Sequence, residues 1–442
     1  MKKYLIMFSV FLFVSPLFAQ EKMDLKEISK TILGFLNTGE FEKVRSYLDS
    51  SAENIYTVQK LEQMWKNLNN IAGAYVKTKE TKDDLQSNFT MVTQTLEFQK
   101  KLIDLKLMFR KNNKVGTISI LPNHTVENYK TPGYYDSTKV AEKEVKIFSR
   151  EFILTGLLTA PAAGNKFPIV VLVHGSGPND RDETVGATKM FKDIALGLAT
   201  KGIAVLRFDK RSKTYTSPII RMKSNATVKD ETIDDVVAAV QSLKTYSSID
   251  TNRIYLLGHS LGAMLLPRIA EQVHGVAGLC MIAGNARPLE DQIYDQSVYL
   301  LSIDSMTERK RTLLDTLKAQ LNRVKQIDGS LSDTSMTMLL YHQKSYWADL
   351  NGYHQSEVAK KLNMPIYILH GERDYQVPMT DFNLWKKKLA DKKNVQFKLY
   401  PKLNHMFQEG EGKSLPDDYD KLGNVPVYVI DDIVNWISNK KK

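Results

Sequence analysis

The stretch IYLLGHSLGAMLL, residues 254–266, decides the fold of this chain. Its first four residues are apolar and suit a buried strand, and its last four return to an apolar, helix-like pattern. Between them, the pattern Gly-x-Ser-x-Gly occupies residues 258–262. The two glycines allow a sharp corner that a Cβ would obstruct, so the hydroxyl of Ser260 stands clear of its own backbone. The stretch therefore predicts a strand, a strained turn that carries a reactive serine, and a helix.

Strand-like and helix-like stretches alternate on both sides of this corner. Apolar strands are predicted at residues 169–173, 203–208, 276–283, 365–369 and 395–400, and helices at 236–243 and around 430–437. Residues 169–173 are apolar at every position, which is typical of a strand covered on both faces. Residues 145–148 and 152–158 are predicted to form an antiparallel edge. This alternation indicates an α/β fold with a doubly wound, mainly parallel sheet, which binds ligands at the carboxyl ends of its strands.

Two further residues at predicted strand ends suit acyl transfer by a serine. Such a reaction needs a base for the hydroxyl proton, an acid that orients the base, and N–H donors for the oxyanion. His405 follows the strand 395–400, and Asp374 follows the strand 365–369. Ser260, Asp374 and His405 are therefore the candidate catalytic residues.

Three motifs resemble the α/β-hydrolase superfamily: HGSGPNDRDET at residues 174–184, GHSLG at 258–262 and HGERD at 370–374. The resemblance covers about residues 140–440 and is to the bacterial carboxylesterase branch, near the acylaminopeptidase-like and dienelactone-hydrolase-like groups. It implies that Ser260 is the nucleophile, His405 the general base and Asp374 its orienting acid. It also implies an oxyanion hole made by the backbone N–H groups of Ser176 and Leu261.

Some neighbouring residues are alternatives for these roles. Glu372 is a second carboxylate beside Asp374, and Gly177 could donate in place of Ser176. Ser176 is not expected to be a nucleophile, because no glycine stands two residues before it. Of the eight histidines, only His405 lies in the loop after the last strand, which favours it as the base.

The charged residues near these loops are expected to be structural. Asp180, Arg181 and Asp182 are predicted to form a salt-bridged loop rather than a metal or substrate site. Residues 209–211 could line the entrance to the site, and a solvated loop is the default expectation. No spacing of histidines suits a metal ion, so neither a metal nor another cofactor is expected.

A long insertion at residues 287–363 corresponds to the lid that the resemblance implies. Its apolar residues recur at helical spacing over 289–301 and 313–321, which predicts amphipathic helices. Four aromatic residues near its end could wall an acyl pocket or form the core of the lid: Tyr341, His342, Tyr346 and Trp347.

Residues 22–125 are predicted to form a separate, small α+β domain, because helical patterns are followed by alternating strands. Helices are predicted at 25–36, 41–48 and 58–68, and strands at 89–98, 102–109 and 115–121. The stretches FEKV and LEQMW, at 41–44 and 61–65, resemble the domain of unknown function found ahead of some bacterial α/β-hydrolases, which is similar to nuclear-transport-factor-2-like folds. This domain holds no cluster of reactive side chains, and a role in homo-oligomer formation is a hypothesis. Residues 126–140 are predicted to be a linker, and 141–442 the catalytic domain.

The N-terminus and the charge suggest an exported protein. Lys2 and Lys3 precede an apolar run at residues 4–14, and Ala19 is the small residue at a cleavage site, so residues 1–19 are predicted to be a signal peptide. That run is shorter than the roughly 20 residues that span a bilayer. The formal charge of +11 falls to +9 once Lys2 and Lys3 are removed. We expect a periplasmic or secreted protein without a membrane span, a nucleic-acid partner or a reactive thiol at Cys280.

The leading functional hypothesis is a serine hydrolase that cleaves small carboxylic esters through an acyl-enzyme. A serine peptidase or aminoacyl hydrolase could use the same three residues. Dienelactone hydrolase itself is disfavoured, because that family has cysteine where this chain has Ser260. A binding protein on a hydrolase scaffold is a third reading, and it conflicts with a complete set of catalytic residues.

Overall fold

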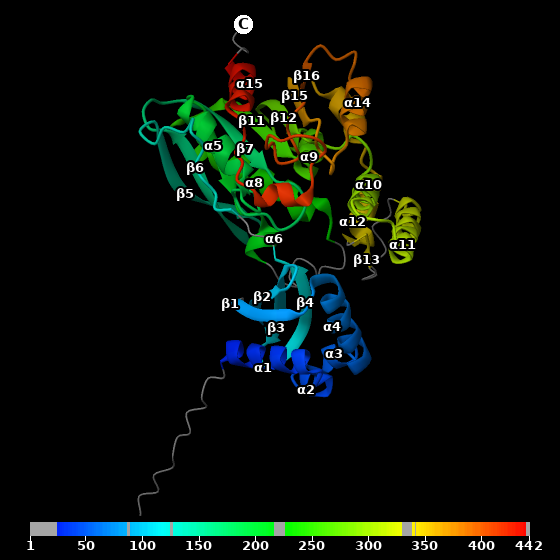
Figure 1. Cartoon of the computed structure of the whole chain (residues 1–442). Coiled ribbons are helices and arrows are strands. Elements are labelled where there is room, and N and C mark those ends of the chain that lie inside the picture. Colours follow the sequence, from blue (N-terminus) through cyan, green and yellow to red (C-terminus); the bar gives the residue numbers. More distant parts are fainter. Residues whose placement is uncertain are drawn as a thin grey trace, which may run out of the picture. The chain divides into compact units, whose positions relative to one another are not determined.

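The computed structural model describes residues 24–85, 89–123, 127–215, 226–328, 338–340 and 342–438 (Figure 1). The predicted signal peptide and Tyr341 lie outside these ranges. The chain divides into two compact units, Met1–Thr125 and Val126–Lys442.

The first unit packs helices on one face of an antiparallel sheet. Its elements are α1 (Leu25–Thr38), α2 (Phe41–Arg45), α3 (Ser50–Glu53), α4 (Val58–Ala72), β1 (Tyr75–Leu85), β2 (Phe89–Phe98), β3 (Leu102–Arg110) and β4 (Val115–Pro122). The strand order is β1-β2-β3-β4. Leu36, Leu61 and Leu105 are fully buried in its core. The α+β architecture agrees with the prediction, but α3 and β1 were not predicted.

The second unit is built on an eight-stranded sheet in the order β16-β15-β12-β11-β7-β10-β6-β5. Its strands are β5 (Val140–Ser149), β6 (Phe152–Pro161), β7 (Phe167–Val173), β10 (Ala204–Phe208), β11 (Ile249–His259), β12 (Val276–Ile282), β15 (Ile366–Gly371) and β16 (Val395–Tyr400). β6 pairs antiparallel with β5 and β10, and the other neighbours pair in parallel. The predicted doubly wound, mainly parallel sheet is therefore confirmed.

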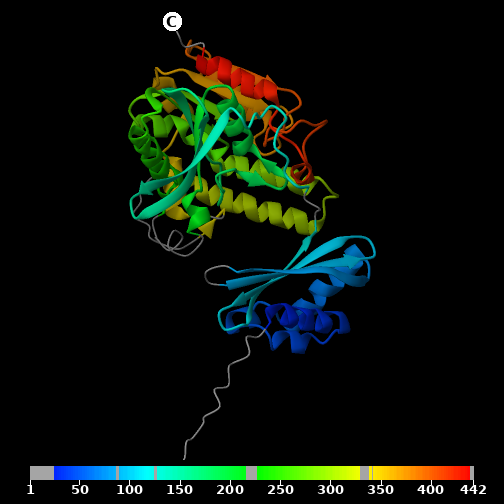
Figure 2. The same ribbon diagram turned by 90° about the vertical axis from the view of Figure 1, so that its left-hand side faces the viewer.

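Helices cover both faces of this sheet (Figure 2). Ile169, Val171 and Val173 of β7 pack into the same cluster as α8 (Asp234–Ser242) and α9 (Leu261–Gln272). Val170 and Leu172 point to the opposite face, where they pack with α5 (Met190–Thr200) and α15 (Val427–Ser438). Both faces of β7 are covered, which explains its unbroken apolar sequence.

Shorter elements complete the second unit. They are β8 (Thr184–Val185), β9 (Thr188–Lys189), α6 (Arg211–Thr214), η1 (Lys229–Ile233), η2 (Leu243–Thr245), α14 (Met379–Lys388) and η3 (Pro416–Asp420). The insertion between β12 and β15 contains α10 (Leu289–Ser302), α11 (Glu308–Lys325), β13 (Met338–Leu339), β14 (His342–Gln343), α12 (Lys344–Asn351) and α13 (Gln355–Lys361). Its predicted helices are present. Trp347 is fully buried and donates to the carbonyl of Leu339, so this side chain belongs to the core of the insertion.

The segment before β5 differs from the predicted linker. Tyr129 donates a hydrogen bond of 2.8 Å to Asp193 on α5, and Tyr134 donates one of 2.9 Å to the carbonyl of Val425. Asp193 is buried, which raises its pKa to about 6. Residues 127–139 are therefore irregular chain packed on the second unit. Their Pro and Gly residues predict turns, but these turns also place two aromatic side chains against α5.

The structure bears on two expectations, that Cys280 is unreactive and that the chain has no membrane span. Cys280 is buried in β12, and burial raises the pKa of its thiol, so it is an unreactive core residue. Within the ranges that the structure covers, no helix combines the length and the apolar character needed to span a membrane.

Candidate active site

The predicted nucleophile Ser260 stands on the corner between β11 and α9. Its φ is 53°, a left-handed conformation that is strained for any residue with a Cβ. A Cβ added to Gly258 would lie 2.6 Å from the carbonyl carbon of Gly262, and one added to Gly262 would lie 2.2 Å from the carbonyl oxygen of Val173. Both positions therefore require glycine, as the sequence pattern predicted.

Asp374 and His405 meet in loops that follow two neighbouring parallel strands, β15 and β16. The Nδ1 of His405 lies 2.6 Å from Oδ2 of Asp374, and both side chains are buried. The other oxygen of Asp374 accepts the N–H groups of Gln376 and Val377 at 2.7 and 2.9 Å. Burial alone would raise the pKa of Asp374, but His405 and these N–H groups hold it below its usual value. An ionised Asp374 keeps the proton of His405 on Nδ1, which leaves Nε2 free to accept another.

The corner and the imidazole lie at the same edge of the sheet. The ring centroids of His259 and His405 are 4.5 Å apart, and Nε2 of His259 lies 3.0 Å from the backbone oxygen of His405. Because His259 precedes Ser260 in the chain, these contacts bring the loop of His405 against the serine corner. The three predicted catalytic residues thus gather where parallel strands end.

The two predicted oxyanion donors also border the serine. Leu261 is the first residue of α9, so its N–H has no acceptor within the helix. A Cβ added to Gly175 would lie 3.2 Å from the Cβ of Ser260, so the loop after β7 passes directly beside the serine. Ser176 is the next residue of that loop, and it is exposed.

Buried ion pairs support this loop, and here one expectation was wrong. Residues 209–211 are not a solvated loop, because Lys210 and Arg211 are only 2% and 1% exposed. Lys210 pairs with Glu231 at 2.5 Å, and Nε of Arg211 donates to Asp235 at 2.9 Å. Charged residues stay buried when they find such partners, and the sequence around 209–211 does not show partners that come from η1 and α8.

The neighbouring loop at residues 180–182 is salt-bridged, as expected. Arg181 pairs with Asp209 at 2.6 Å, and Arg207 pairs with Asp182 at 3.0 Å. In the described portions of the chain, no group of three or more His, Cys, Asp or Glu residues is arranged to hold a metal ion.

Sequence reasoning assigned no role to Glu183, which the structure places beside the site. One carboxylate oxygen accepts the N–H of Gly175 at 2.7 Å, and the other lies 3.2 Å from Nδ1 of His259. Nε2 of His259 faces the carbonyl of His405, so both ring nitrogens of His259 face acceptors. A neutral imidazole has only one N–H, and therefore this geometry favours the charged form. Burial opposes that charge, but Glu183 outweighs it and the pKa of His259 is raised.

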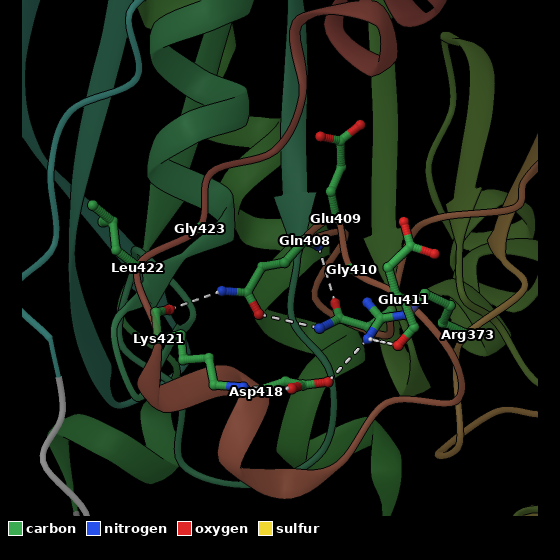
Figure 3. A pocket seen from close by; sticks show the side chains of 10 residues that line it. Arg373, Gln408, Glu409, Gly410, Glu411, Asp418, Lys421, Leu422 and Gly423 are labelled. Carbon is green, nitrogen blue, oxygen red and sulfur yellow. Dashed lines mark hydrogen bonds and ion pairs between the residues drawn. The ribbon is translucent and has the colours of Figure 1, made fainter.

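A polar cavity of about 280 Å³ borders the loops that carry Asp374 and His405, since Arg373 and Asn404 belong to its lining (Figure 3). It is lined by Arg373, Asn404, Gln408, Glu409, Gly410, Glu411, Asp418, Lys421, Leu422 and Gly423. Arg373 donates to the carbonyl of Gly412 at 2.6 Å and to Asp418 at 3.0 Å. Asn404 accepts the N–H groups of Met406 and Gln408 at 3.0 Å each. Arg373 and Asn404 directly precede Asp374 and His405, so their hydrogen bonds fix the loops that carry the imidazole–carboxylate pair.

The arrangement offers a hydroxyl on a strained corner, a buried imidazole–carboxylate pair and main-chain N–H groups at one sheet edge. These are the groups that acyl transfer requires. The N-terminal unit contributes none of them.

Two family profiles and one curated protein are similar to this chain. A profile of the family described as serine aminopeptidase, S33, matches residues 165–411, and a profile described as a protein of unknown function, DUF3887, matches residues 29–117. Esterase EstD from Thermotoga maritima is 36% identical over 404 residues, which cover 91% of this chain and 92% of that protein.

Two solved structures show the likeness in fold. Est1E from Butyrivibrio proteoclasticus is 16% identical with a TM-score of 0.42, over 67% of this chain and 99% of that chain. An acylaminoacyl peptidase from Pyrococcus horikoshii is 15% identical with a TM-score of 0.43, over 76% of this chain and 53% of that chain. Both likenesses concern the fold alone. The family match spans more than half of the chain and the relationship to EstD spans nearly all of it, so the chain belongs to the serine aminopeptidase S33 family of α/β-hydrolases.

Proposed function

We propose that this enzyme is a serine esterase that hydrolyses small carboxylic esters through an acyl-enzyme. The observation that carries the proposal is the buried contact of 2.6 Å between His405 and Asp374, at the sheet edge where Ser260 occupies its strained corner. The relationship to a protein named as an esterase supports ester substrates.

In the proposed reaction, Oγ of Ser260 attacks the ester carbonyl carbon and its proton passes to Nε2 of His405. The carbonyl oxygen becomes an oxyanion, which accepts hydrogen bonds from the N–H groups of Leu261 and Ser176. The C–O bond to the alcohol then breaks, and His405 returns the proton to the departing alcohol. A water molecule then attacks the acyl-enzyme in the same way, with His405 again taking and returning a proton, and the carboxylic acid is released. Asp374 stabilises the imidazolium during both acylation and deacylation.

A serine peptidase or aminoacyl hydrolase is the second candidate. The description of the S33 family as serine aminopeptidases favours it, and the chemistry of the nucleophile would be the same. Membership of an enzyme family disfavours the reading as a binding protein on a hydrolase scaffold.

The proposal also covers export of the enzyme and its assembly into a homo-oligomer. Lys2, Lys3 and the apolar run at residues 4–14 support export through a signal peptide cleaved near Ala19. The first unit is proposed to form a homo-oligomer. N-terminal sequencing of the secreted protein and light scattering of the full chain test these two statements.

The activity test compares p-nitrophenyl esters with aminoacyl p-nitroanilides. Ser260→Ala is expected to lower kcat for the ester by about 10⁴-fold to 10⁶-fold. Ser242→Ala is the matched control, because Ser242 ends α8 and its hydroxyl donates to the carbonyl of Ala239 within the same helix. Ser176→Pro removes one proposed oxyanion N–H and should cost about 100-fold to 1000-fold.

Each outcome separates the candidate functions. Equal ester turnover by Ser260→Ala and the unmodified enzyme would overturn the assignment of the nucleophile. Anilide turnover far above ester turnover would replace the esterase with the peptidase and keep Ser260 in its role. Full activity in a folded Ser176→Pro variant would remove Ser176 from the oxyanion hole.

A further inference from the structure

The peptide bond between Gly175 and Ser176 carries the N–H of Ser176, one of the two proposed oxyanion donors. Among the described residues no peptide bond is cis, so this one is trans and its C=O and N–H point in opposite directions. A group that holds the carbonyl oxygen of Gly175 therefore also fixes the direction of the N–H of Ser176.

Two side chains hold that oxygen. Nζ of Lys210 donates to it at 2.8 Å, and Nδ2 of Asn179 donates at 3.2 Å. The backbone N–H of Lys210 in turn donates to the carbonyl of Asn179 at 3.1 Å, so the two donors are tied to each other. Of the two, Lys210 is buried and charged, which makes its hydrogen bond the stronger one.

A chain of buried contacts holds Lys210 in place. Its Nζ also donates to Oε1 of Glu231 at 2.5 Å, and Oε2 of Glu231 accepts the hydroxyl of Tyr346 at 2.8 Å. Burial alone would raise the pKa of Glu231, but Lys210, with smaller contributions from His342 and Tyr346, holds it below its usual value. Glu231 is thus an anion that anchors the ammonium. Tyr346 comes from α12, so the insertion provides the outer end of this chain.

We propose that Lys210 is a positioning residue for the oxyanion hole: its ammonium fixes the Gly175–Ser176 peptide so that the N–H of Ser176 points at the developing oxyanion. The ammonium also polarises this peptide, which strengthens the N–H as a donor. The inference rests on the proposed function, because it needs a tetrahedral adduct on Ser260.

A purely structural role for Lys210 is the alternative. In that case the Lys210–Glu231 pair would only stabilise the fold, and its loss would leave the stabilisation of the oxyanion unchanged in any variant that still folds. The distinguishing quantity is therefore the affinity for a ligand that forms an oxyanion on Ser260. A trifluoromethyl ketone with an alkyl chain is such a ligand, since the serine adds to its carbonyl.

The experiment measures kcat and KM for a p-nitrophenyl ester and the inhibition constant of the trifluoromethyl ketone in the full-length enzyme. Lys210→Met keeps the length of the side chain and removes the charge. We expect kcat and the affinity for the ketone to fall together by about 10-fold to 100-fold, somewhat less than for the loss of a whole donor. KM is expected to stay within about twofold, because the N–H matters most in the transition state. Lys213→Met on α6 is the matched control, because Lys213 is exposed, and it should leave all three constants unchanged.

A second variant keeps the test decisive if Lys210→Met does not fold. Lys210→Met/Glu231→Gln removes both buried charges, so no unpaired carboxylate remains, and it should show the same loss of ketone affinity. A folded double variant that binds the ketone as tightly as the unmodified enzyme would overturn the role of Lys210. Failure of the proposed function looks different, because Ser260→Ala would then keep its ester turnover.

Discussion

At the scale of single residues, the charge state of His259 follows from its two acceptors. Nδ1 faces the carboxylate of Glu183 and Nε2 faces the backbone oxygen of His405. The other titratable groups around this pair are the imidazole of His405, whose ring centroid lies 4.5 Å from that of His259, Asp374, and His174 on the side of Glu183. Burial lowers the pKa of His174 to about 4, so it is neutral near pH 7. His259 and Glu183 thus form a second imidazole–carboxylate pair that joins the oxyanion loop to the loop of the base.

Glu183→Gln tests this pair through pH dependence. The pKa of His259 is raised in the folded enzyme, so its contribution to stability is full below its ordinary pKa of 6.5 and is lost as pH rises through the raised value. The glutamine amide can donate to Nδ1 of a neutral His259, and we therefore expect the variant to fold. The free energy of unfolding in urea should fall by about 1–3 kcal/mol at pH 6, and the difference from the unmodified enzyme should shrink towards pH 10.

The matched control is Glu357→Gln. Glu357 forms exposed ion pairs with Lys360 and Lys388, which solvent screens, so this change should leave the free energy of unfolding nearly unchanged at either pH. A loss of stability in Glu183→Gln that is the same at pH 6 and pH 10 would show that His259 is not charged. ¹⁵N spectra of histidine-labelled enzyme provide a direct check, because the raised pKa of His259 means that both ring nitrogens should carry protons at pH 6.

At the scale of elements, the corner between β11 and α9 depends on close backbone packing. The Cα of Gly262 lies so near β7 that an added Cβ would come within 2.2 Å of the oxygen of Val173 and 2.5 Å of that of His174. Backbone atoms cannot move aside as a flexible side chain can. Since Ser260 stands two residues earlier, any shift of α9 also moves the nucleophile.

Gly262→Ala should therefore lower both stability and activity. We expect a loss of about 1–3 kcal/mol or more in the free energy of unfolding, because overpacking forces the backbone to shift. Gly352→Ala is the control, since a Cβ there would meet no atom closer than 3.9 Å and its φ of −79° suits alanine. Urea unfolding and ester turnover of the two variants provide the measurements. Equal stability of Gly262→Ala and Gly352→Ala would contradict the close packing seen at the corner.

The sequence predicted best those elements in which consecutive residues meet the same physical requirement, such as burial on both faces of a sheet. Strands covered on both faces, such as β7 and β15, have unbroken apolar runs, so the parallel sheet could be predicted. Strand β1 could not be predicted, because it lies at the edge of its sheet beside β2 and most of its side chains are exposed. Its sequence therefore shows no apolar alternation. The short helix α3, with four residues, is too brief for a periodic pattern.

The candidate site shows the same contrast. Ser260, Asp374 and His405 each follow a predictable strand, and their positions at strand ends made them the candidate catalytic residues. Lys210 also follows a strand, β10, but its partners Glu231 and Tyr346 come from distant parts of the chain. A charged residue is predicted to be exposed when its ion-pair partners are not evident in the sequence. This explains why the expectation for residues 209–211 was wrong.

At the scale of the whole molecule, the proposed catalytic groups are confined to Val126–Lys442. The supporting contacts of Glu183, Lys210 and Arg373 also come from residues within this unit. Residues 127–139 belong to it as well, because Tyr134 lies against α5: a Cβ added to Gly197 would come within 2.9 Å of the Tyr134 ring. The unit therefore begins near residue 126 and not near residue 141.

Two shortened enzymes test this boundary. A chain of residues 126–442 should keep kcat for the ester within about twofold, since no residue of the proposed machinery is removed. A chain of residues 141–442 loses Tyr129 and Tyr134, which leaves Asp193 without its phenol donor and exposes the surface of α5. Its free energy of unfolding should be lower by about 1–3 kcal/mol, because two half-buried aromatic side chains and the phenol donor to a buried carboxylate are lost. If both chains unfold at the same urea concentration, residues 127–139 contribute nothing to stability and act as the linker that their composition suggests.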